Sequence, residues 1–428
     1  MILSENLLHF IWEKKVFNKK LRTVCNKFIE IIDTGIHNSN QGPDFLFARL
    51  LIGDTEWAGN VEIHVNSQEY NQHGHDLDLN YNNVILHVVW RHNCSSYYHS
   101  PILELSNCVN KELLPFYHEL LIGQSLIPCS KFILVNADKK ISSWISSLGH
   151  KLQVDRAIKF IDMLNSFNGN WEQAIWVLLC RNFGLKVNSN SFNELAFSIP
   201  ISLVRKYKSS RLSIEALLMG QAGLLSESFK DEYAMKLWIE FNRLKGLHKI
   251  NFHSPPVYFL RMRPASFPTI RLAQLASFIE NITCLLSFCK SCNSTKSVKH
   301  FFNVQVSPYW NNHYVFDSLA ISQLKSLGDV FIYTIIINTI VPVLNAYGRM
   351  SGDNEYITQA NALLMNIPPE SNKIIKEFKK IGLIPRNANE SQSYLHIYNT
   401  YCSKIKCTQC EIGICSNYRD SDYSIIQL

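Results

Sequence analysis

The sequence changes character near residue 138, and this change constrains the fold more than any other feature. Before it, short runs rich in β-branched and aromatic residues alternate with turn residues, which is typical of strands. After it, apolar residues recur at helical spacing and strand signals become rare. A chain of 428 residues is also too long for one typical core. We therefore expect an α/β domain over 1–135, a mostly α-helical domain over 136–395 and a small Cys-rich tail over 396–428.

The N-terminal domain is expected to contain a helix and a sheet. Apolar side chains recur at helical spacing over 4–17. Strands are predicted over 28–32, 45–52, 57–65 and 84–90. Gly53 and Asp54 favour a hairpin between the second and third strands, and the almost wholly apolar second strand is expected to be buried on both faces. The predicted order is helix, three strands, crossover, strand.

The two parts of the chain differ in the sign of their charge. Residues 1–135 contain 10 Lys and Arg against 14 Asp and Glu, and the remaining residues contain 32 against 21, so the net charges are −4 and +11. An acidic module suits a divalent cation, and a basic module suits a polyanion such as nucleic acid. Solvated surface explains the basic charge equally well, because no block of consecutive like charges occurs. We expect a nucleic-acid partner, DNA rather than RNA, and make no prediction of oligomeric state.

The sequence favours a cytoplasmic location. Its first residues lack the basic segment and long apolar run of a secretory signal. The most apolar stretch, over 330–343, is shorter than the roughly 20 residues of a spanning helix and is predicted to be a buried helix. Twelve cysteines without an export signal indicate thiols or metal ligands in a reducing compartment. No membrane partner is expected.

Three residues of the predicted hairpin form a candidate active site. Asp44 stands at the entry to the strand over 45–52. Glu62 and His64 are two residues apart in the next strand, so they share one face about 7 Å apart. If the strands pair, Asp44 and Glu62 converge, and two close carboxylates suit Mg²⁺ or Mn²⁺. A third group there could orient or deprotonate a water for attack on phosphate. The alternative is an amphipathic strand whose Glu62 and His64 face water.

This region resembles the PD-(D/E)XK nuclease superfamily in motif and in element order. The resemblance implies a restriction-endonuclease-like mixed sheet with Asp44 and Glu62 as catalytic metal ligands. His64 stands where the family normally has lysine, and this departs from the pattern. Histidine can act as a general base or a metal ligand, but it does not provide the fixed positive charge of lysine.

Two further features extend the resemblance. Some short-patch mismatch-repair endonucleases of the superfamily use histidines at this site and carry a nearby His-Gly-His segment, and this chain has His73 and His75 around a glycine. The resemblance thus implies that His73 and His75 contact nucleic acid. An acidic residue of the first helix often joins such sites, which points to Glu5 in preference to Glu13.

The His-Gly-His segment also allows a zinc interpretation, because closely spaced histidines followed by aspartate are common zinc ligands. It partly resembles the signature of metallo-β-lactamase-like hydrolases, but Leu77 and Asp78 break that signature. His87, inside the last predicted strand, is expected to be a hydrogen-bonded core histidine.

The tail contains a second candidate metal site. Cys402, Cys407, Cys410 and Cys415 have the spacing C-x4-C-x2-C-x4-C, which suits either an iron–sulfur cluster or a structural zinc. Iron–sulfur modules are known partners of DNA-processing nucleases, whereas zinc fits a small knuckle, and the spacing does not decide between them.

Three arginines in the helical part are candidate nucleic-acid contacts. Arg261, Arg263 and Arg271 lie among prolines that stiffen the backbone, and guanidinium groups suit phosphate oxygens. The alternative is that they tie helix ends to carboxylates elsewhere.

Several segments together identify the chain as similar to the bacterial family called domain of unknown function 2851. These segments are 42–45, 57–64, 73–75, 84–89, 215–225, 261–274 and 401–413. The family supplies no established activity, so function must come from the site itself. We expect metal-dependent hydrolysis of phosphodiester bonds in DNA or RNA. The alternative is a non-catalytic nucleic-acid-binding or scaffold protein that retains a nuclease-like fold.

Overall fold

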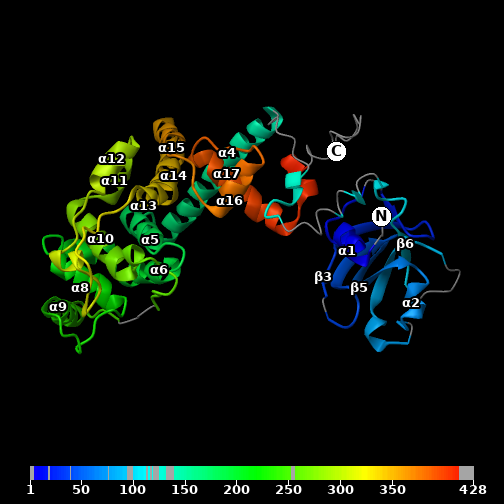
Figure 1. The fold of residues 1–428 in the computed structure, drawn as a ribbon, viewed down its shortest axis with the longest axis horizontal. Coiled ribbons are helices and arrows are strands. Elements are labelled where there is room, and N and C mark those ends of the chain that lie inside the picture. The colour runs from blue at the N-terminus through cyan, green and yellow to red at the C-terminus, as the bar shows by residue number, and fades with distance from the viewer. Residues whose placement is uncertain are drawn as a thin grey trace. The chain divides into compact units, whose positions relative to one another are not determined.

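The computed structural model divides the chain into two compact units. The first comprises residues 1–141, 376–383 and 395–428, and the second comprises 142–375 and 384–394. Figure 1 shows the N-terminal sheet and the helices of the second unit. The division places the described tail cysteines in the same unit as the sheet. The structure describes residues 4–413 except 18–19, 39, 76, 94–99, 112–113, 116–117, 119–124, 132–138 and 252–255.

A mixed sheet forms the centre of the first unit. Among the described residues its strands follow the order β1-β2-β4-β5-β6-β7, with β3 paired to β4. The neighbours from β2 through β4 to β5 are antiparallel, whereas β5, β6 and β7 are parallel. The bounds are β1 Leu21–Arg22, β2 Phe28–Asp33, β3 Ile36–His37, β4 Phe45–Ile52, β5 Thr55–Asn66, β6 Val84–Arg91 and β7 Ile102–Glu104.

The predicted order of helix, three strands, crossover and strand is confirmed. Helix α1 (Glu5–Glu13) precedes the sheet, and α2 (Glu69–Gln72) with a 3₁₀ turn (Leu79–Tyr81) connects β5 to β6. The short strands β1, β3 and β7 were not predicted, because two or three residues carry too little periodic signal.

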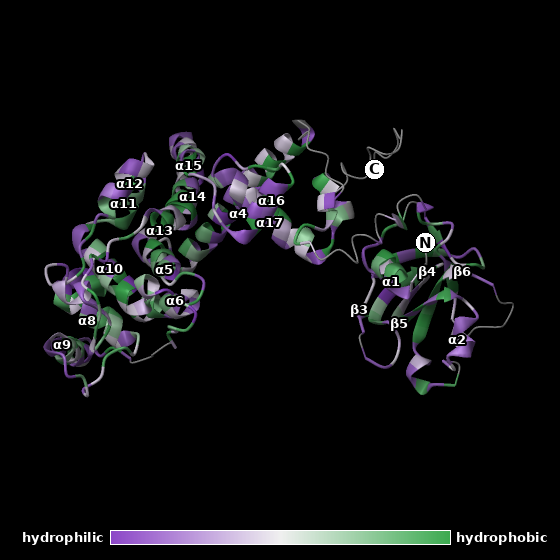
Figure 2. Cartoon of the chain, viewed as in Figure 1, coloured by the Kyte–Doolittle hydropathy of each residue, from purple (hydrophilic) through white to green (hydrophobic). Residues whose placement is uncertain are grey.

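Helix α1 is held by an apolar face. Its buried side chains recur at the spacing of one helix face and are Leu7, Leu8, Phe10, Ile11 and Trp12. Figure 2 shows hydrophobic residues in α1 and through the strands, whereas α2 is mostly hydrophilic. Burial of each large apolar side chain stabilises the unit by about 1.5–3 kcal/mol. The apolar face therefore fixes α1, and with it the polar residues on its other side.

The hairpin between β4 and β5 is confirmed, since Ile52 pairs with Thr55 and Gly53 takes a positive φ of 63°. The prediction that β4 is buried on both faces is wrong. Phe47 is 73% exposed, and its φ of 61° lies at a break in register between Phe45 and Ala48. An antiparallel strand with a bulge presents alternate residues to solvent, even when its sequence is almost wholly apolar.

The second unit is mostly helical, as predicted, with one small described hairpin of β8 (His313–Val315) and β9 (Ser318–Leu319). Three of its helices, α4, α16 and α17, cross the unit boundary. The helices are α4 Lys139–Ser166, α5 Trp171–Phe183, α6 Ser189–Ser198, α7 Ile201–Lys206, α8 Arg211–Gln221, α9 Glu232–His248, α10 Pro268–Asn281, α11 Leu285–Ser291, α12 Thr295–Phe301, α13 Asp329–Ile335, α14 Val341–Ser351, α15 Asn354–Asn366, α16 Lys373–Lys380 and α17 Ala388–Thr400.

One continuous helical stretch is long and apolar enough to cross a membrane. It runs over Asp329–Ser351 and comprises α13, a π-helical segment (Ile336–Ile340) and α14. Of its most apolar window, 72% is buried inside the protein. The stretch is thus mostly buried inside the protein, which confirms the buried helix predicted over 330–343.

Candidate metal centre

The hairpin register brings Asp44 and Glu62 together. Asp44 directly precedes β4, whose first residue, Phe45, pairs with Val61 on β5. The backbone N–H of Asp44 donates to Glu62 Oε2 at 3.1 Å, and the backbone N–H of Ile63 donates to Asp44 Oδ2 at 2.9 Å. The Glu62 carboxylate therefore accepts a hydrogen bond from the backbone of Asp44, and the Asp44 carboxylate accepts one from the residue next to Glu62. The two acids converge on one side of the sheet, as the spacing predicted.

Glu62 and His64 do not face water. They are 4% and 2% exposed, so the alternative of a solvated amphipathic strand is wrong. The neighbouring Val61 and Ile63 are buried on the opposite face, as the alternation predicted. Burial of a carboxylate and an imidazole side by side in a central strand costs free energy unless the two groups interact with each other or with a ligand.

Two histidines contact the carboxylate of Glu62, and a third lies beside them. Its Oε1 lies 3.6 Å from His64 Nε2 and 3.4 Å from His75 Nε2. One ligand nitrogen of each of His64, His73 and His75 lies within 4.8 Å of the other two. Within the part of the chain that the structure describes, this is the one group of at least three potential ligands gathered so tightly. The positive φ of Gly74, 73°, turns the loop after α2 so that both loop histidines reach β5.

Helix α1 supplies two further polar groups. His9 Nε2 lies 3.3 Å from Asp44 Oδ2, and its Nδ1 lies 3.3 Å from Nε2 of His37. Glu5, one turn earlier on α1, lies close enough for its charge to raise the pKa of Glu62. The pKa of Glu5 is itself raised by partial burial and then by Asp44. Glu5 thus lies near both acidic residues, and its catalytic role stays a prediction. His9 was missed, although its spacing of four residues from Glu5 places it on the same helix face.

The electrostatics of the site favour a cation. Burial, followed by the charge of Asp44, raises the pKa of Glu62 to about 9, so this carboxyl holds a proton at pH 7. Burial, followed by His75, lowers the pKa of His64 to about 4. Burial also lowers the pKa of His87 to about 3. Metal ligands must be deprotonated to bind. The neutral imidazoles already are, and a bound cation would stabilise the ionised form of the Glu62 carboxyl.

His87 is a buried core histidine, as predicted. Its Nε2 lies 3.0 Å from His64 Nδ1 on the neighbouring strand. Because Nδ1 of His64 faces His87, the other ring nitrogen, Nε2, faces the Glu62 carboxylate. A hydrogen bond at one ring nitrogen fixes the tautomer and orientation of a ligating imidazole, so His87 is placed to orient His64.

The predicted nucleic-acid arginines lie in the second unit and have different surroundings. Arg271 is 7% exposed, stacks 3.8 Å from the ring centre of Phe331 and donates to Gln274 at 2.9 Å. Its guanidinium therefore serves packing, and we remove Arg271 from the predicted binding surface. Arg261 and Arg263 are exposed, so they remain predicted contacts to nucleic acid.

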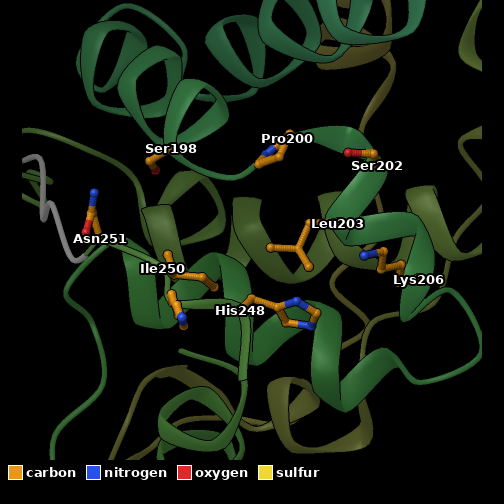
Figure 3. Close-up of a pocket in the computed structure, with 9 residues that line it drawn as sticks. Ser198, Pro200, Ser202, Leu203, Lys206, His248, Ile250 and Asn251 are labelled. Carbon is orange, nitrogen blue, oxygen red and sulfur yellow. The ribbon is translucent and has the colours of Figure 1, made fainter. Parts of the chain in front are cut away.

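Two hollows in the second unit are lined by cationic side chains. Figure 3 shows Ser202, Lys206 and His248 around one of them, a hollow of about 500 Å³ that Lys249 also lines. The other, of about 620 Å³, has no acidic residue among its described lining residues. Its cationic lining residues are Arg156, Lys159, Arg181 and Lys186.

Comparison with known proteins identifies the family and nothing beyond it. Residues 5–373 match the family described as "Protein of unknown function (DUF2851)". The chain belongs to this family. The DUF2851 match contains the metal centre from Glu5 to His87 and ends before the tail cysteines. No curated protein and no solved structure matches the chain.

Proposed function

We propose that this DUF2851 protein is a metal-dependent nuclease with a restriction-endonuclease-like N-terminal unit. The order of α1, the antiparallel strands β2, β4 and β5, the crossover and the parallel β6 supports this fold. The observation that carries the proposal is a pair of hydrogen bonds, from the Asp44 backbone N–H to Glu62 and from the backbone N–H of the adjacent Ile63 to Asp44. In a nuclease of this kind, an aspartate at one strand and an acid on the next hold the cation.

The ligand chemistry favours Mn²⁺ as the activating ion. Carboxylates suit Mg²⁺ and Mn²⁺, whereas imidazole suits later transition metals, so a site with both kinds of ligand suits Mn²⁺ best. Asp44 and Glu62 would hold the ion, with His64 and His75 beside Glu62 as further ligands. A bound cation supplies Lewis acidity toward phosphate and lowers the pKa of a bound water.

The surrounding residues have separate roles in this proposal. His9 contacts the Asp44 carboxylate and holds it in place. The low pKa of His64 keeps its imidazole neutral at pH 7, so its Nε2 carries a free lone pair that can bind the cation. This role does not need the positive charge that lysine supplies in related nucleases.

Nucleic acid, DNA rather than RNA, is the proposed partner. The cationic hollows of the second unit and the exposed Arg261 and Arg263 support a polyanionic ligand. We propose a cytoplasmic location, which suits both such a substrate and the many free thiols.

A cleavage screen of the full chain tests the proposal. Single- and double-stranded DNA and RNA are incubated with Mn²⁺, with Mg²⁺ and with a chelator. We expect cleavage with Mn²⁺ and none with the chelator. Binding without cleavage under any metal would instead support the non-catalytic nucleic-acid-binding protein, and neither binding nor cleavage would remove both functions.

Metal binding should release a proton from Glu62. With a pKa of about 9, this carboxyl is protonated at pH 7 and must ionise to bind a cation. His64, with a pKa of about 4, has no proton to lose at that pH. Calorimetric titration with Mn²⁺ in buffers of different ionisation enthalpy should therefore show release of about one proton at pH 7, and the affinity should rise with pH up to about 9. Glu62→Gln should abolish this release, and an affinity independent of pH would contradict the assignment.

Removal of the side chains of Arg261 and Arg263 should weaken DNA binding and reduce its salt dependence. We expect the double alanine variant to lower affinity uniformly across sequences and to reduce the slope of log affinity against log salt by about 1 for each phosphate that is no longer neutralised. The control is Lys236→Ala, an exposed cation that pairs with Glu232 at 2.6 Å. Equal slopes for the double variant and the wild type would exclude these arginines from the interface.

A further inference from the structure

A cysteine far from the tail in sequence joins the tail cysteines in the first unit. Cys129 lies in a 3₁₀ turn (Pro128–Lys131), and its side chain hydrogen-bonds to that of Cys407. The charges of Cys402 and Cys410 also act on Cys129, which places all four thiols in one neighbourhood. All four side chains are buried. The clustering therefore combines residues from two distant parts of the chain.

The backbone of the tail is arranged around these sulphur atoms. The N–H groups of Ile412 and Gly413 donate to the sulphur of Cys410. Burial, the larger effect, raises the pKa of the Cys410 thiol to about 11, and these two donors oppose that shift. Gly413 packs directly on the Cys407 backbone, since an added Cβ would lie 2.2 Å from the Cys407 carbonyl oxygen. The tail thus winds tightly around the cluster.

A further contact ties the tail to the start of α4. Lys140 Nζ lies 3.2 Å from a carboxylate oxygen of Glu411, next to Cys410. Isolated buried cysteines elsewhere differ from this cluster. Cys180, for example, sits fully buried in the apolar core of the second unit. Ordinary core packing explains such a cysteine but does not explain four thiols from two segments.

We propose that Cys129, Cys402, Cys407 and Cys410 form a four-thiolate metal site, in which Cys129 replaces the predicted Cys415 as the fourth ligand. Cys415 lies outside the described residues. Four thiolates suit a zinc ion or an iron–sulfur cluster, and binding releases the thiol protons. The sulphur atoms are more widely spaced than the imidazole nitrogens of the metal centre, so coordination requires the tail turns to close around the metal.

The site has a structural consequence. A metal at these four residues links residue 129 to residue 402, and most of the intervening chain forms the second unit. A cross-link that closes so long a loop stabilises the folded chain by restricting the unfolded one. The proposal does not depend on nuclease activity, because none of its ligands belongs to the metal centre around Glu62.

Metal analysis of two matched variants tests the proposal. The full chain, Cys129→Ser and Cys415→Ser are purified without oxygen, and zinc and iron per chain are measured by mass spectrometry. We expect Cys129→Ser to lower the metal content about tenfold or more and Cys415→Ser to leave it unchanged. Zinc without colour identifies a zinc site, and iron with a brown colour identifies a cluster. Loss in Cys415→Ser alone, equal content in all three proteins, or a wild-type chain that takes up neither metal would overturn the assignment.

A spectroscopic measurement on the wild type keeps the test valid if Cys129→Ser fails to fold. X-ray absorption at the metal edge counts the sulphur neighbours of the bound metal. For zinc we expect four sulphur atoms at about 2.3 Å. Three sulphur atoms with one nitrogen or oxygen would contradict a fourth cysteine. Failure of the nuclease proposal would leave this result unaffected.

Discussion

Glu62→Gln should reduce Mn²⁺-dependent cleavage by about a thousandfold, because a metal ion contributes several kcal/mol to transition-state stabilisation and each 1.4 kcal/mol is about tenfold in rate. The amide preserves the size of the side chain and can still accept the hydrogen bond from the backbone N–H of Asp44. It removes the negative charge that a cation needs. Asp44→Asn should act in the same direction, since Asp44 lies beside Glu62 on the same side of the sheet.

The control for this experiment lies on the same strand. Glu56 is an exposed residue of β5 that pairs with Arg49 at the far end of the hairpin. Glu56→Gln should leave the cleavage rate within about twofold of the wild type, because exposed ion pairs contribute little. Circular dichroism establishes that each variant is folded. Full activity in a folded Glu62→Gln variant would remove Glu62 from the catalytic site.

Glu215→Ala should destabilise the second unit by about 4 kcal/mol, because it leaves buried hydrogen-bond donors without an acceptor and opens a cavity. The Glu215 carboxylate is fully buried. It accepts hydrogen bonds from Ser307 Oγ at 2.6 Å, Trp310 Nε1 at 2.9 Å and Tyr233 Oη at 3.0 Å. Burial raises the pKa of Glu215, and the three donors oppose that shift. Glu215 begins one of the segments that carry the family resemblance, and the structure assigns it to the core.

Differential scanning calorimetry measures this effect, because intrinsic fluorescence would report all eight tryptophans together. We expect the transition of the second unit to fall by about 10 °C. Glu227→Ala, an exposed substitution on the loop after α8, should shift it by about 1 °C or less. Equal shifts for the two variants would show that the buried network contributes no more than a surface residue.

The core of the metal centre could be predicted because it depends on local pairing. Alternation along β5 and the two-residue turn at Gly53 set the register near the turn. The bulge between Phe45 and Ala48, which the sequence did not reveal, shifts this register by one residue and brings Asp44 beside Glu62. The prediction of Glu5 came from a family resemblance. His9 lies beside Asp44 through the packing of α1, which the spacing of the strands does not reveal.

Other features of the molecule depend on contacts between distant segments. The approach of His73 and His75 to His64 depends on the loop between β5 and β6, and their predicted contact with nucleic acid stays a prediction. Arg271 looked like its exposed neighbours in sequence, because composition does not distinguish a buried arginine from a surface one. Cys129 carried no spacing signal, since its nearest partner in the cluster is more than two hundred positions away.

Anomalous diffraction from crystals grown with Mn²⁺ tests the central claim most directly, because it locates the ion without relying on activity. We predict a peak at the manganese edge between the carboxylates of Asp44 and Glu62, with the imidazoles of His64 and His75 beside it, and no such peak in Glu62→Gln. A wild-type crystal whose manganese lies elsewhere, or which binds none at this site, would contradict the account.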